Sequence, residues 1–227
     1  MKRFYGRGRE LVLLKKMERQ SRTSATFTLL MGRRRIGKTE LARQIMKQSD
    51  MSCYLFTTKI AEPVLASMWQ ESLLSDLGLR ISGRIDNLKD LFNEIFVFSL
   101  DNHFTLVIDE FQDLQKINEA FFSDLQNLWD NYKNNSKLNL IVSGSILSMM
   151  VKIFEDSKEP LFGRSTAKLV LKPFPPSTIK EILEDYNPDY SNEDLLCLYM
   201  LTGGVPRYLS LLLDGGAYTK EEMIKAA

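Results

Sequence analysis

The stretch from Thr26 to Thr39 decides the fold; it reads Thr-Phe-Thr-Leu-Leu-Met-Gly-Arg-Arg-Arg-Ile-Gly-Lys-Thr. Residues 26–31 are apolar or β-branched throughout, which predicts a buried strand. Residues 32–39 match the pattern G-x-x-x-x-G-K-[ST], and a helical pattern follows from Lys38 to Gln48. A strand, this glycine-bounded loop and a helix, in that order, are typical of a phosphate-binding loop. The alternative is a basic turn that merely precedes a helix.

The fixed positions of this loop each suit a phosphate. Gly32 and Gly37 allow backbone N–H groups to turn inward around phosphate oxygens at a helix N-terminus. Lys38 reaches the β- and γ-phosphate oxygens, and the Thr39 hydroxyl is a ligand for Mg²⁺. The other residues expected to contact the nucleotide here are Arg35, Ile36 and Glu40. Because three successive arginines repel one another, residues 33–35 are expected either to meet an anion or acidic group or to point into solvent.

Apolar runs and helical patterns alternate along the next part of the chain, which predicts parallel strands covered by helices. The expected strands are residues 52–57, 104–109, 138–143 and 168–171. The expected helices between them are residues 63–77, 88–100, 120–134 and 146–154. The sequence therefore predicts an α/β fold with a five-stranded parallel sheet.

The cluster Pro173-Phe174-Pro175-Pro176 marks a change in organisation. Beyond it only helical patterns occur, at residues 177–186, at residues 192–201 and after Pro206. We therefore expect a core over residues 1–173 and a small helical lid over residues 174–227. Residues 219–222 have the form of a capping box that opens one more helix. Since that helix begins so near the last residue, we expect either that the sequence is truncated within or after the lid or that it is a short homologue of longer proteins.

Two carboxylates, Asp109 and Glu110, follow one another at the end of the strand predicted at residues 104–109. Chain order places this strand in the same sheet as the phosphate-binding loop, which is the Walker B arrangement. There Asp109 would hold the Mg²⁺ shell, and Glu110 would orient and deprotonate the water that attacks a γ-phosphate. Adjacent carboxylates also occur as ordinary surface charges at strand ends, an explanation that the neighbouring phosphate-binding loop disfavours.

Three further positions have both a functional and a structural explanation. Ser145, after the fourth strand, is placed either to contact a γ-phosphate or to cap the helix that follows. Arg164, in the loop before the last strand, suits an arginine finger or a phosphate sensor, or is simply solvated. The run Gly203–Tyr208 is explained by turn chemistry alone, with Pro206 at the first position of a helix.

Together these motifs resemble the archaeal-type ATPases of the AAA+/STAND group of P-loop proteins. The resemblance covers nearly the whole chain and rests, besides the phosphate-binding loop, on residues 4–7 (Phe-Tyr-Gly-Arg), 108–112 (Ile-Asp-Glu-Phe-Gln), 144–145 (Gly-Ser), 162–164 (Phe-Gly-Arg) and 204–206 (Gly-Val-Pro). It implies a sheet in the order 5-1-4-3-2 and a helical lid that closes over the nucleotide.

The resemblance also implies roles for single residues. The Phe4–Arg7 segment, with Tyr5 and Arg7, and the turn at Pro206 would flank the adenine and the base of the site. Ser145 or Ser143 would act as the first sensor, and Arg164 and Arg207 would be the finger and the lid sensor, in the same chain or in a neighbour. Members of the family continue into a winged-helix-like region and often a nuclease-like domain, which this sequence does not encode.

Composition excludes several other classes of protein. No stretch of the 227 residues is apolar for long enough to cross a bilayer, and no secretory signal is legible, so a cytoplasmic location is expected. Two distant cysteines in apolar contexts, Cys53 and Cys197, predict buried reduced thiols. A single histidine, His103, expected in a turn, leaves no ligand set for zinc and no Ser/His triad.

The expected function is therefore Mg²⁺-dependent hydrolysis of ATP to ADP, coupled to lid movement or to a partner. No Asn-Lys-x-Asp motif for guanine is present, which favours ATP over GTP. One alternative is a nucleotide-gated switch that hydrolyses ATP slowly. Another is a DNA-associated ATPase, suggested by the family and by the basic runs at residues 2–3 and 33–35, although the net charge is only +1. Expected partners are further copies of the chain, another protein or a missing C-terminal domain.

Overall fold

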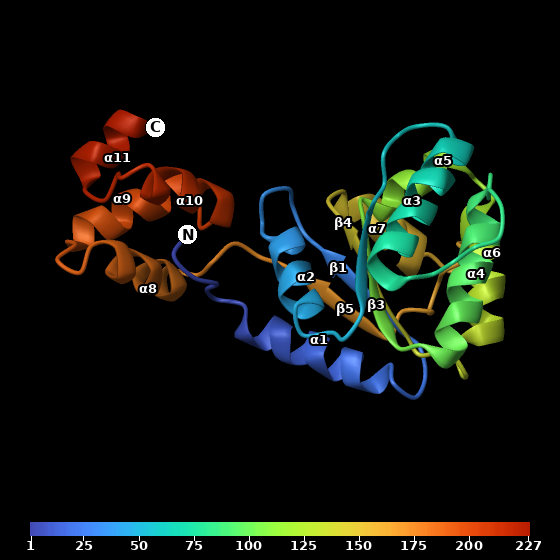
Figure 1. Cartoon of the computed structure of the whole chain (residues 1–227). Coiled ribbons are helices and arrows are strands. Elements are labelled where there is room, and N and C mark those ends of the chain that lie inside the picture. Colours follow the sequence, from blue (N-terminus) through green and yellow to red (C-terminus); the bar gives the residue numbers. More distant parts are fainter. The chain divides into compact units, whose positions relative to one another are not determined.

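Five apolar runs of the sequence form strands that pair in parallel in one sheet (Figure 1), in a computed structural model that describes all residues, 1–227. They are β1 (Thr26–Met31), β2 (Ser52–Phe56), β3 (Phe104–Asp109), β4 (Leu138–Gly144) and β5 (Ala167–Val170). Their order is β2-β3-β4-β1-β5, which is the expected 5-1-4-3-2 order read from the other edge. The predicted α/β fold and the strand order are confirmed.

The contacts within the chain divide it into two compact units, a sheet unit and a helical unit. The sheet unit comprises Glu10–Gly32 and Thr39–Val170. The helical unit comprises Met1–Arg9, Arg33–Lys38 and Leu171–Ala227. The sequence predicted a single division after residue 173, whereas the structure places it before Leu171 and assigns the N-terminal segment and residues 33–38 to the helical unit as well. The physical reason for the first addition is that Tyr5 is buried in the core of the helical unit.

Helices begin near most of the predicted positions in and at the borders of the sheet unit. They are α1 (Gly8–Gln20), α2 (Lys38–Met46), α3 (Glu62–Leu77), α4 (Leu88–Asp101), α5 (Leu114–Ile117), α6 (Phe121–Tyr132) and α7 (Leu147–Glu155), with a 3-10 turn η1 (Phe111–Asp113). Helix α1, the turn η1 and the short α5 were not predicted. Among the apolar residues of α1, only Leu14 and Met17 are buried, which leaves a faint apolar stripe.

The main core fills one face of the sheet and joins it to α3, α4, α6 and α7. At its centre the Phe27 ring of β1 contacts Phe111, Trp129 and Phe154, with ring centroids 6.5, 5.0 and 5.4 Å away. Phe111 directly follows Glu110 and is fully buried. Burial of a large aromatic ring is strongly favourable, so this cluster fixes the chain at the point where β3 ends.

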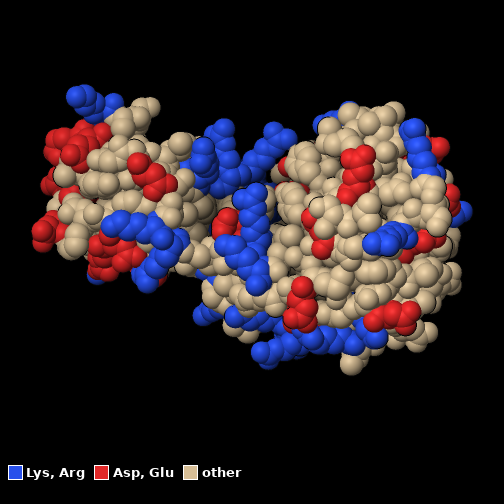
Figure 2. All heavy atoms as spheres, viewed as in Figure 1, with Lys and Arg blue, Asp and Glu red and all other residues tan.

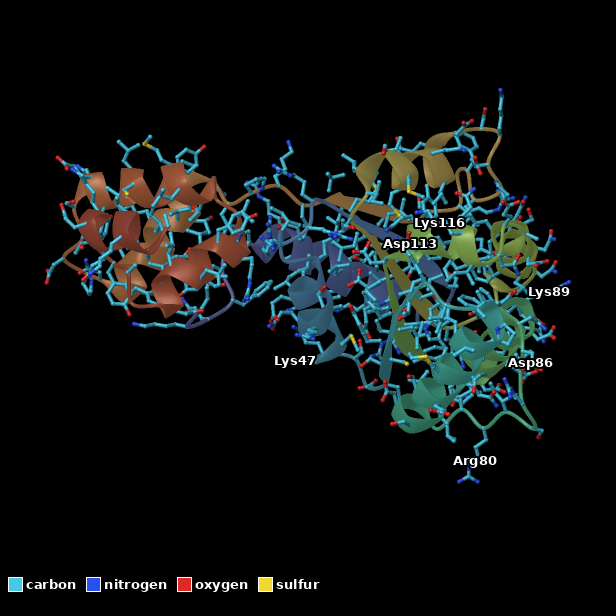
Figure 3. The ribbon with its side chains drawn as sticks, turned by 90° about the horizontal axis from the view of Figure 1, so that it is seen from above. Lys47, Arg80, Asp86, Lys89, Asp113 and Lys116 are labelled. Carbon is cyan, nitrogen blue, oxygen red and sulfur yellow. The ribbon has the colours of Figure 1, made fainter.

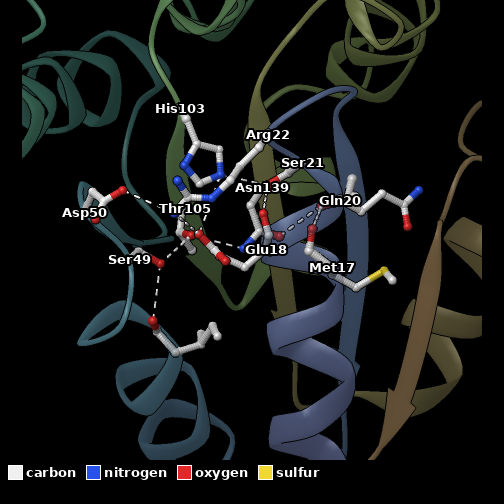
Figure 4. A network of polar contacts seen from close by, with 12 residues as sticks. Met17, Glu18, Gln20, Ser21, Arg22, Ser49, Asp50, His103, Thr105 and Asn139 are labelled. Carbon is white, nitrogen blue, oxygen red and sulfur yellow. Dashed lines mark hydrogen bonds and ion pairs between the residues drawn. The ribbon is translucent and has the colours of Figure 1, made fainter.

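The opposite face of the sheet carries a layer of buried polar side chains (Figure 4). Asn139 of β4 donates to the Thr105 hydroxyl of β3 and accepts from the Thr26 hydroxyl of β1, both at 3.0 Å. The Thr105 hydroxyl also contacts that of Ser49, just beyond α2, at 2.8 Å. Because a one-residue slip of any strand would leave these buried groups without partners, the layer helps to specify the register.

The helical unit consists of α8 (Pro176–Tyr186), α9 (Asn192–Thr202), α10 (Pro206–Asp214) and α11 (Lys220–Ala226). Its core contains Leu183, Leu198, Leu209 and Met223. Three sequence signals are confirmed in it. Pro206 stands in the first turn of α10, Gly203 ends α9 in the left-handed conformation, and a capping box opens α11.

Both cysteines are free thiols; Cys53 is buried and Cys197 is half-buried. The prediction of two buried thiols is therefore correct for Cys53 only. His103 lies in the loop between α4 and β3, as expected. No helix has both the length and the apolar character needed to cross a membrane.

Candidate functional site

The two motifs singled out in the sequence hold the only two non-glycine residues of the chain with positive φ. Arg35 of the phosphate-binding loop has φ 68° and Glu110, after β3, has φ 53°. Side chains with a Cβ rarely adopt this left-handed region, and such strain persists where the surroundings enforce it. Gly37, with φ 93°, turns the loop into the N-terminus of α2. Both motifs thus have the constrained backbone that functional loops commonly show.

Within residues 33–38 of the helical unit, the loop closes on itself. Lys38 is buried, and its Nζ donates to the Arg33 carbonyl at 3.2 Å. Ile36 is buried as well, whereas the side chains of Arg33 and Arg34 are exposed. Arg35 is exposed too, and its guanidinium hydrogen-bonds the neutral Tyr208 hydroxyl, so all three loop arginines follow the solvent-facing alternative.

In the sheet unit, Thr39 and Asp109 lie side by side at the carboxyl edge of the sheet. The Thr39 hydroxyl donates to Asp109 Oδ2 at 3.1 Å. Asp109 is buried, and its Oδ1 accepts the backbone N–H of Glu110 at 2.9 Å. A hydroxyl and a carboxylate in contact are oxygen ligands of the kind that Mg²⁺ takes in addition to phosphates and water. Glu40, in contrast, is exposed and accepts a hydrogen bond from Gln44 on the surface of α2.

The Glu110 carboxylate is held by two neighbouring side chains. The Ser145 hydroxyl, just after β4, lies 2.9 Å from Oε1 and 2.7 Å from Oε2. Gln112 Nε2 donates to Oε2 at 2.7 Å. Ser145 therefore contacts Glu110, and it does not cap a helix, because α7 begins at Leu147 with Ile146 as its N-cap. The Ser143 hydroxyl is buried and has no hydrogen-bond partner.

The other carboxylate of this edge, Asp113, has a different role. Asp113 Oδ1 lies 3.5 Å from Lys116 Nζ (Figure 3). Asp113 Oδ2 lies 3.6 Å from Lys59 Nζ. No group of three or more His, Cys, Asp or Glu residues is arranged to hold a metal ion. Zinc sites need three or four such ligands. Thr39 and Asp109 instead fit a Mg²⁺ ion, which keeps several water and phosphate ligands.

Arg164 lies at the other edge of the sheet unit. Its guanidinium donates twice to Asp130 Oδ2, at 3.1 and 2.7 Å, and also to the Pro160 carbonyl. Burial alone would raise the pKa of Asp130, but its hydrogen bonds from Arg164 and Lys133 outweigh burial and lower it. Because the loop before β5 meets the amino ends of the strands, Arg164 is remote from Thr39 and Asp109. A role of Arg164 as finger or sensor for the phosphates of its own chain is therefore ruled out.

In the helical unit, Arg7 fastens the phosphate-binding loop. The Arg7 side chain is buried, and its Nη2 donates to the Ile36 carbonyl at 3.2 Å and to the Lys172 carbonyl at 2.7 Å. Its guanidinium also stacks on the Phe174 ring, 4.7 Å from the centroid. Tyr5 is 2% exposed and its hydroxyl donates to Asp185, so its ring is core packing and is not open to an adenine.

Helix α10 contacts the same loop. The Arg35 guanidinium donates to the Tyr208 hydroxyl at 3.1 Å, and the Arg207 N–H donates to the Arg35 carbonyl at 3.4 Å. Pro206 is buried, and a Cβ added to Gly37 would lie 3.9 Å from its ring. Pro206, Arg207 and Arg35 are thus brought together. The Arg207 side chain is exposed.

Comparison with known proteins decides the family. Residues 4–212 match the family described as an ATPase domain predominantly from Archaea. The chain belongs to this family. It is also 30% identical over 208 residues to an uncharacterized protein of Methanocaldococcus jannaschii. That alignment covers 91% of this chain but 43% of the relative, so the chain spans less than half the length of that protein.

Solved structures show the same fold as this ATPase domain. The Walker-type ATPase of Pyrococcus abyssi superimposes with a TM-score of 0.72 at 20% identity, covering 98% of this chain and 71% of the other. The ORC2 protein of Aeropyrum pernix, solved as ADPNP-ADP complexes, gives a TM-score of 0.68 at 13% identity, with coverages of 99% and 68%.

The ATPase domain contains one site residue that the sequence did not reveal. The hydroxyl of Tyr54, on β2, donates to Asp109 Oδ2 at 2.5 Å. Burial, together with this hydrogen bond, raises the pKa of Tyr54, so the phenol stays a donor. No pattern around Tyr54 indicates the contact, because the residues are separated by 55 positions and only strand pairing brings them together.

Some arginines of the basic runs have partners within the helical unit. Arg3 pairs with Glu181 at 3.0 Å and with Asp185 at 2.8 Å. Arg35 is bound to Tyr208. Lys and Arg side chains also line α1, on the side of the molecule that Figure 2 shows. The run at residues 2–3, which suggested DNA binding, is therefore engaged within the helical unit.

Proposed function

We propose that this domain binds Mg²⁺-ATP and hydrolyses it to ADP and phosphate. The observation that carries the proposal is the contact between the Thr39 hydroxyl and the Asp109 carboxylate, with Glu110 next in the chain. A P-loop threonine and a Walker B aspartate are the protein ligands of Mg²⁺ in P-loop enzymes. Membership of an ATPase domain family supports the same reading.

Each residue has a distinct part in the proposed reaction. The backbone N–H groups of residues 32–38 and the Lys38 ammonium bind the β- and γ-phosphate oxygens. Thr39 and Asp109 would hold Mg²⁺, which would neutralise charge that develops on the phosphates. Glu110 accepts a proton from the attacking water, and Ser145 and Gln112 fix the direction of its carboxylate.

We also propose that the nucleotide state is coupled to the helical unit. Support comes from the phosphate-binding loop, because its residues 33–38 belong to the helical unit. Arg7 binds the Ile36 carbonyl of this loop, and Arg35 of the loop binds Tyr208 in the first turn of α10. A phosphate that draws in the N–H groups of this loop pulls on the Ile36 and Arg35 carbonyl contacts as well. A loop with two occupancy states is a common origin of nucleotide-dependent switching.

A slow nucleotide-gated switch is the second candidate, and one observation favours it. Both oxygens of Glu110 already accept hydrogen bonds, from Ser145 and Gln112. The substrate water therefore has to compete with these two donors for the Glu110 carboxylate. A switch would therefore bind ADP or ATP tightly and turn over more slowly than it exchanges nucleotide.

Because Arg164 cannot reach its own phosphates, a finger role requires a neighbouring molecule. We propose that, if the domain assembles, Arg164 acts on the nucleotide of another copy. Its pairing with Asp130 would then have to be exchanged for the phosphate. Turnover that rises with protein concentration in the native protein, and not in Arg164→Ala, would support this role.

The proposal is tested by equilibrium binding and single-turnover hydrolysis with three proteins. The wild type binds ATP in the presence of Mg²⁺ and releases phosphate. Lys38→Ala loses ATP binding, because a charge at the phosphates is removed. Glu110→Gln keeps ATP binding but does not release phosphate. Wild-type phosphate release by Glu110→Gln would overturn the assignment of the base, and absence of nucleotide binding to the wild type would overturn the function.

A further inference from the structure

The pairing of β2 with β3 brings the side chain of Tyr54 next to Asp109, one of the two proposed Mg²⁺ ligands. In the register of β2 and β3, Tyr54 pairs with Val107 and Phe56 pairs with Asp109. Side chains two positions apart on a strand share one face, so Tyr54 and Asp109 are diagonal neighbours on one face of the sheet. The half-buried phenol extends along that face until its oxygen lies 2.5 Å from Asp109 Oδ2.

Three donors define the orientation of the Asp109 carboxylate. Oδ2 accepts from Tyr54 and from Thr39, and Oδ1 accepts the N–H of Glu110. Two of these donors belong to the proposed catalytic motifs, whereas Tyr54 belongs to neither. The phenol has one hydrogen, and it is given to Asp109. Without it, Oδ2 would keep only the Thr39 hydroxyl as a donor, and the rotation of the buried carboxylate about χ2 would be less constrained.

We propose that Tyr54 is a positioning residue for Mg²⁺, which sets how well Asp109 and Thr39 bind the ion. This inference rests on the proposed function, because it needs a Mg²⁺-nucleotide site at these residues. Mg²⁺ demands near-ideal octahedral geometry, so a misdirected carboxylate weakens binding more than it would for a softer ion. Partners that hydrogen-bond a ligating carboxylate typically contribute a factor of about 10–100 in metal affinity.

A purely structural role for Tyr54 makes a different prediction. If the phenol only stabilised the fold, its loss would lower the unfolding temperature. The folded variant would then keep the wild-type affinity for ADP, both with and without Mg²⁺. A positioning role affects only the part of the affinity that depends on Mg²⁺. The ratio of ADP dissociation constants without and with Mg²⁺ therefore separates the two.

The test compares this ratio in wild type, Tyr54→Phe and Tyr132→Phe by calorimetric titration of ADP into protein, in EDTA and in Mg²⁺. Tyr132→Phe is a matched control, since its hydroxyl contacts Asn93 in the same unit, at 3.4 Å. We expect Tyr54→Phe to bind ADP in EDTA as tightly as wild type does. Its ratio of ADP dissociation constants without and with Mg²⁺ should be about tenfold smaller than that of wild type. The control keeps the wild-type ratio.

The outcomes also separate this inference from the proposed function. If wild type binds ADP without any effect of Mg²⁺, the proposed Mg²⁺ site fails and Tyr54 has nothing to position. If wild type shows the effect and Tyr54→Phe keeps the same ratio, the positioning role is wrong and the proposed function stands. Unfolding temperatures of all three proteins are measured without ligand, and titrations are made at least ten degrees below the lowest. A second readout is Mn²⁺ binding to the ADP complex by electron paramagnetic resonance, which must weaken in Tyr54→Phe alone.

Discussion

Replacing Arg7 by alanine should destabilise the helical unit strongly, although Arg7 lies far along the chain from most of that unit. The buried guanidinium donates to the Ile36 and Lys172 carbonyls and stacks on Phe174. A hydrogen bond from a charged donor contributes about 1.5 kcal/mol at the low end, and a cation–π contact about 1 kcal/mol. Two such bonds and one stack give a loss of about 4 kcal/mol, a large share of the stability of a small unit.

Urea unfolding followed by two signals measures this loss. Both tryptophans, Trp69 and Trp129, lie in the sheet unit, so their fluorescence reports that unit, whereas far-ultraviolet circular dichroism reports all helices. In Arg7→Ala the part of the dichroism change that belongs to the helical unit should move to lower urea by the equivalent of about 4 kcal/mol. The fluorescence transition, and the dichroism change that coincides with it, should stay unchanged.

Arg3→Ala is the matched control, because it removes the same side chain from the same segment. Arg3 is exposed and forms surface ion pairs with Glu181 and Asp185, which solvent screens, so we expect little or no loss of stability. A loss below about 1 kcal/mol in Arg7→Ala, no larger than in this control, would refute the account of Arg7.

Three further predictions concern catalysis and stability. Ser145→Ala should lower kcat about tenfold without changing ADP affinity, because it releases one constraint on Glu110; a faster enzyme would show instead that Ser145 restrains the base. Burial, followed by the charge of Arg22, lowers the pKa of His103, so the folded protein binds fewer protons than the unfolded one below about pH 6.5. The stability that neutral His103 contributes should therefore be fully present above that pH and decrease as the pH falls below it. Urea titrations at pH 7.5 and 5.5 should show a smaller decrease in the free energy of unfolding for His103→Gln than for wild type. Arg164→Ala should bind ADP as wild type does in dilute solution, and weaker binding there would contradict its remote position.

The sequence predicted the sheet and the phosphate-binding loop well because their signals are local. Apolar runs of four to seven residues define the strands, and the loop motif fixes the element before and after it. Chain order plus the family resemblance was enough for the strand order. Helix α1 was not predicted, because its buried residues are too few to give a clear apolar periodicity and include a charged one. They are Leu14, Met17 and Glu18.

The site was predicted less completely, since side-chain partners are not local. Asp109 and Glu110 could be predicted because they directly end an apolar strand run. The structure places both at the carboxyl edge of the sheet with Thr39. Arg164 was assigned by chain order, yet the loop before a parallel strand belongs to the amino edge. Tyr54 could be found only from the pairing of β2 with β3.

Steady-state phosphate release from Mg²⁺-ATP, with Glu110→Gln as the matched control, tests the central claim most directly. We predict turnover for wild type that requires Mg²⁺, and a loss of at least about 100-fold in Glu110→Gln, which still binds ATP. Measurement over a wide range of protein concentration shows in addition whether assembly contributes. Equal turnover by the two proteins, or turnover without Mg²⁺, would contradict the assignment of Glu110, Thr39 and Asp109 as the hydrolytic site.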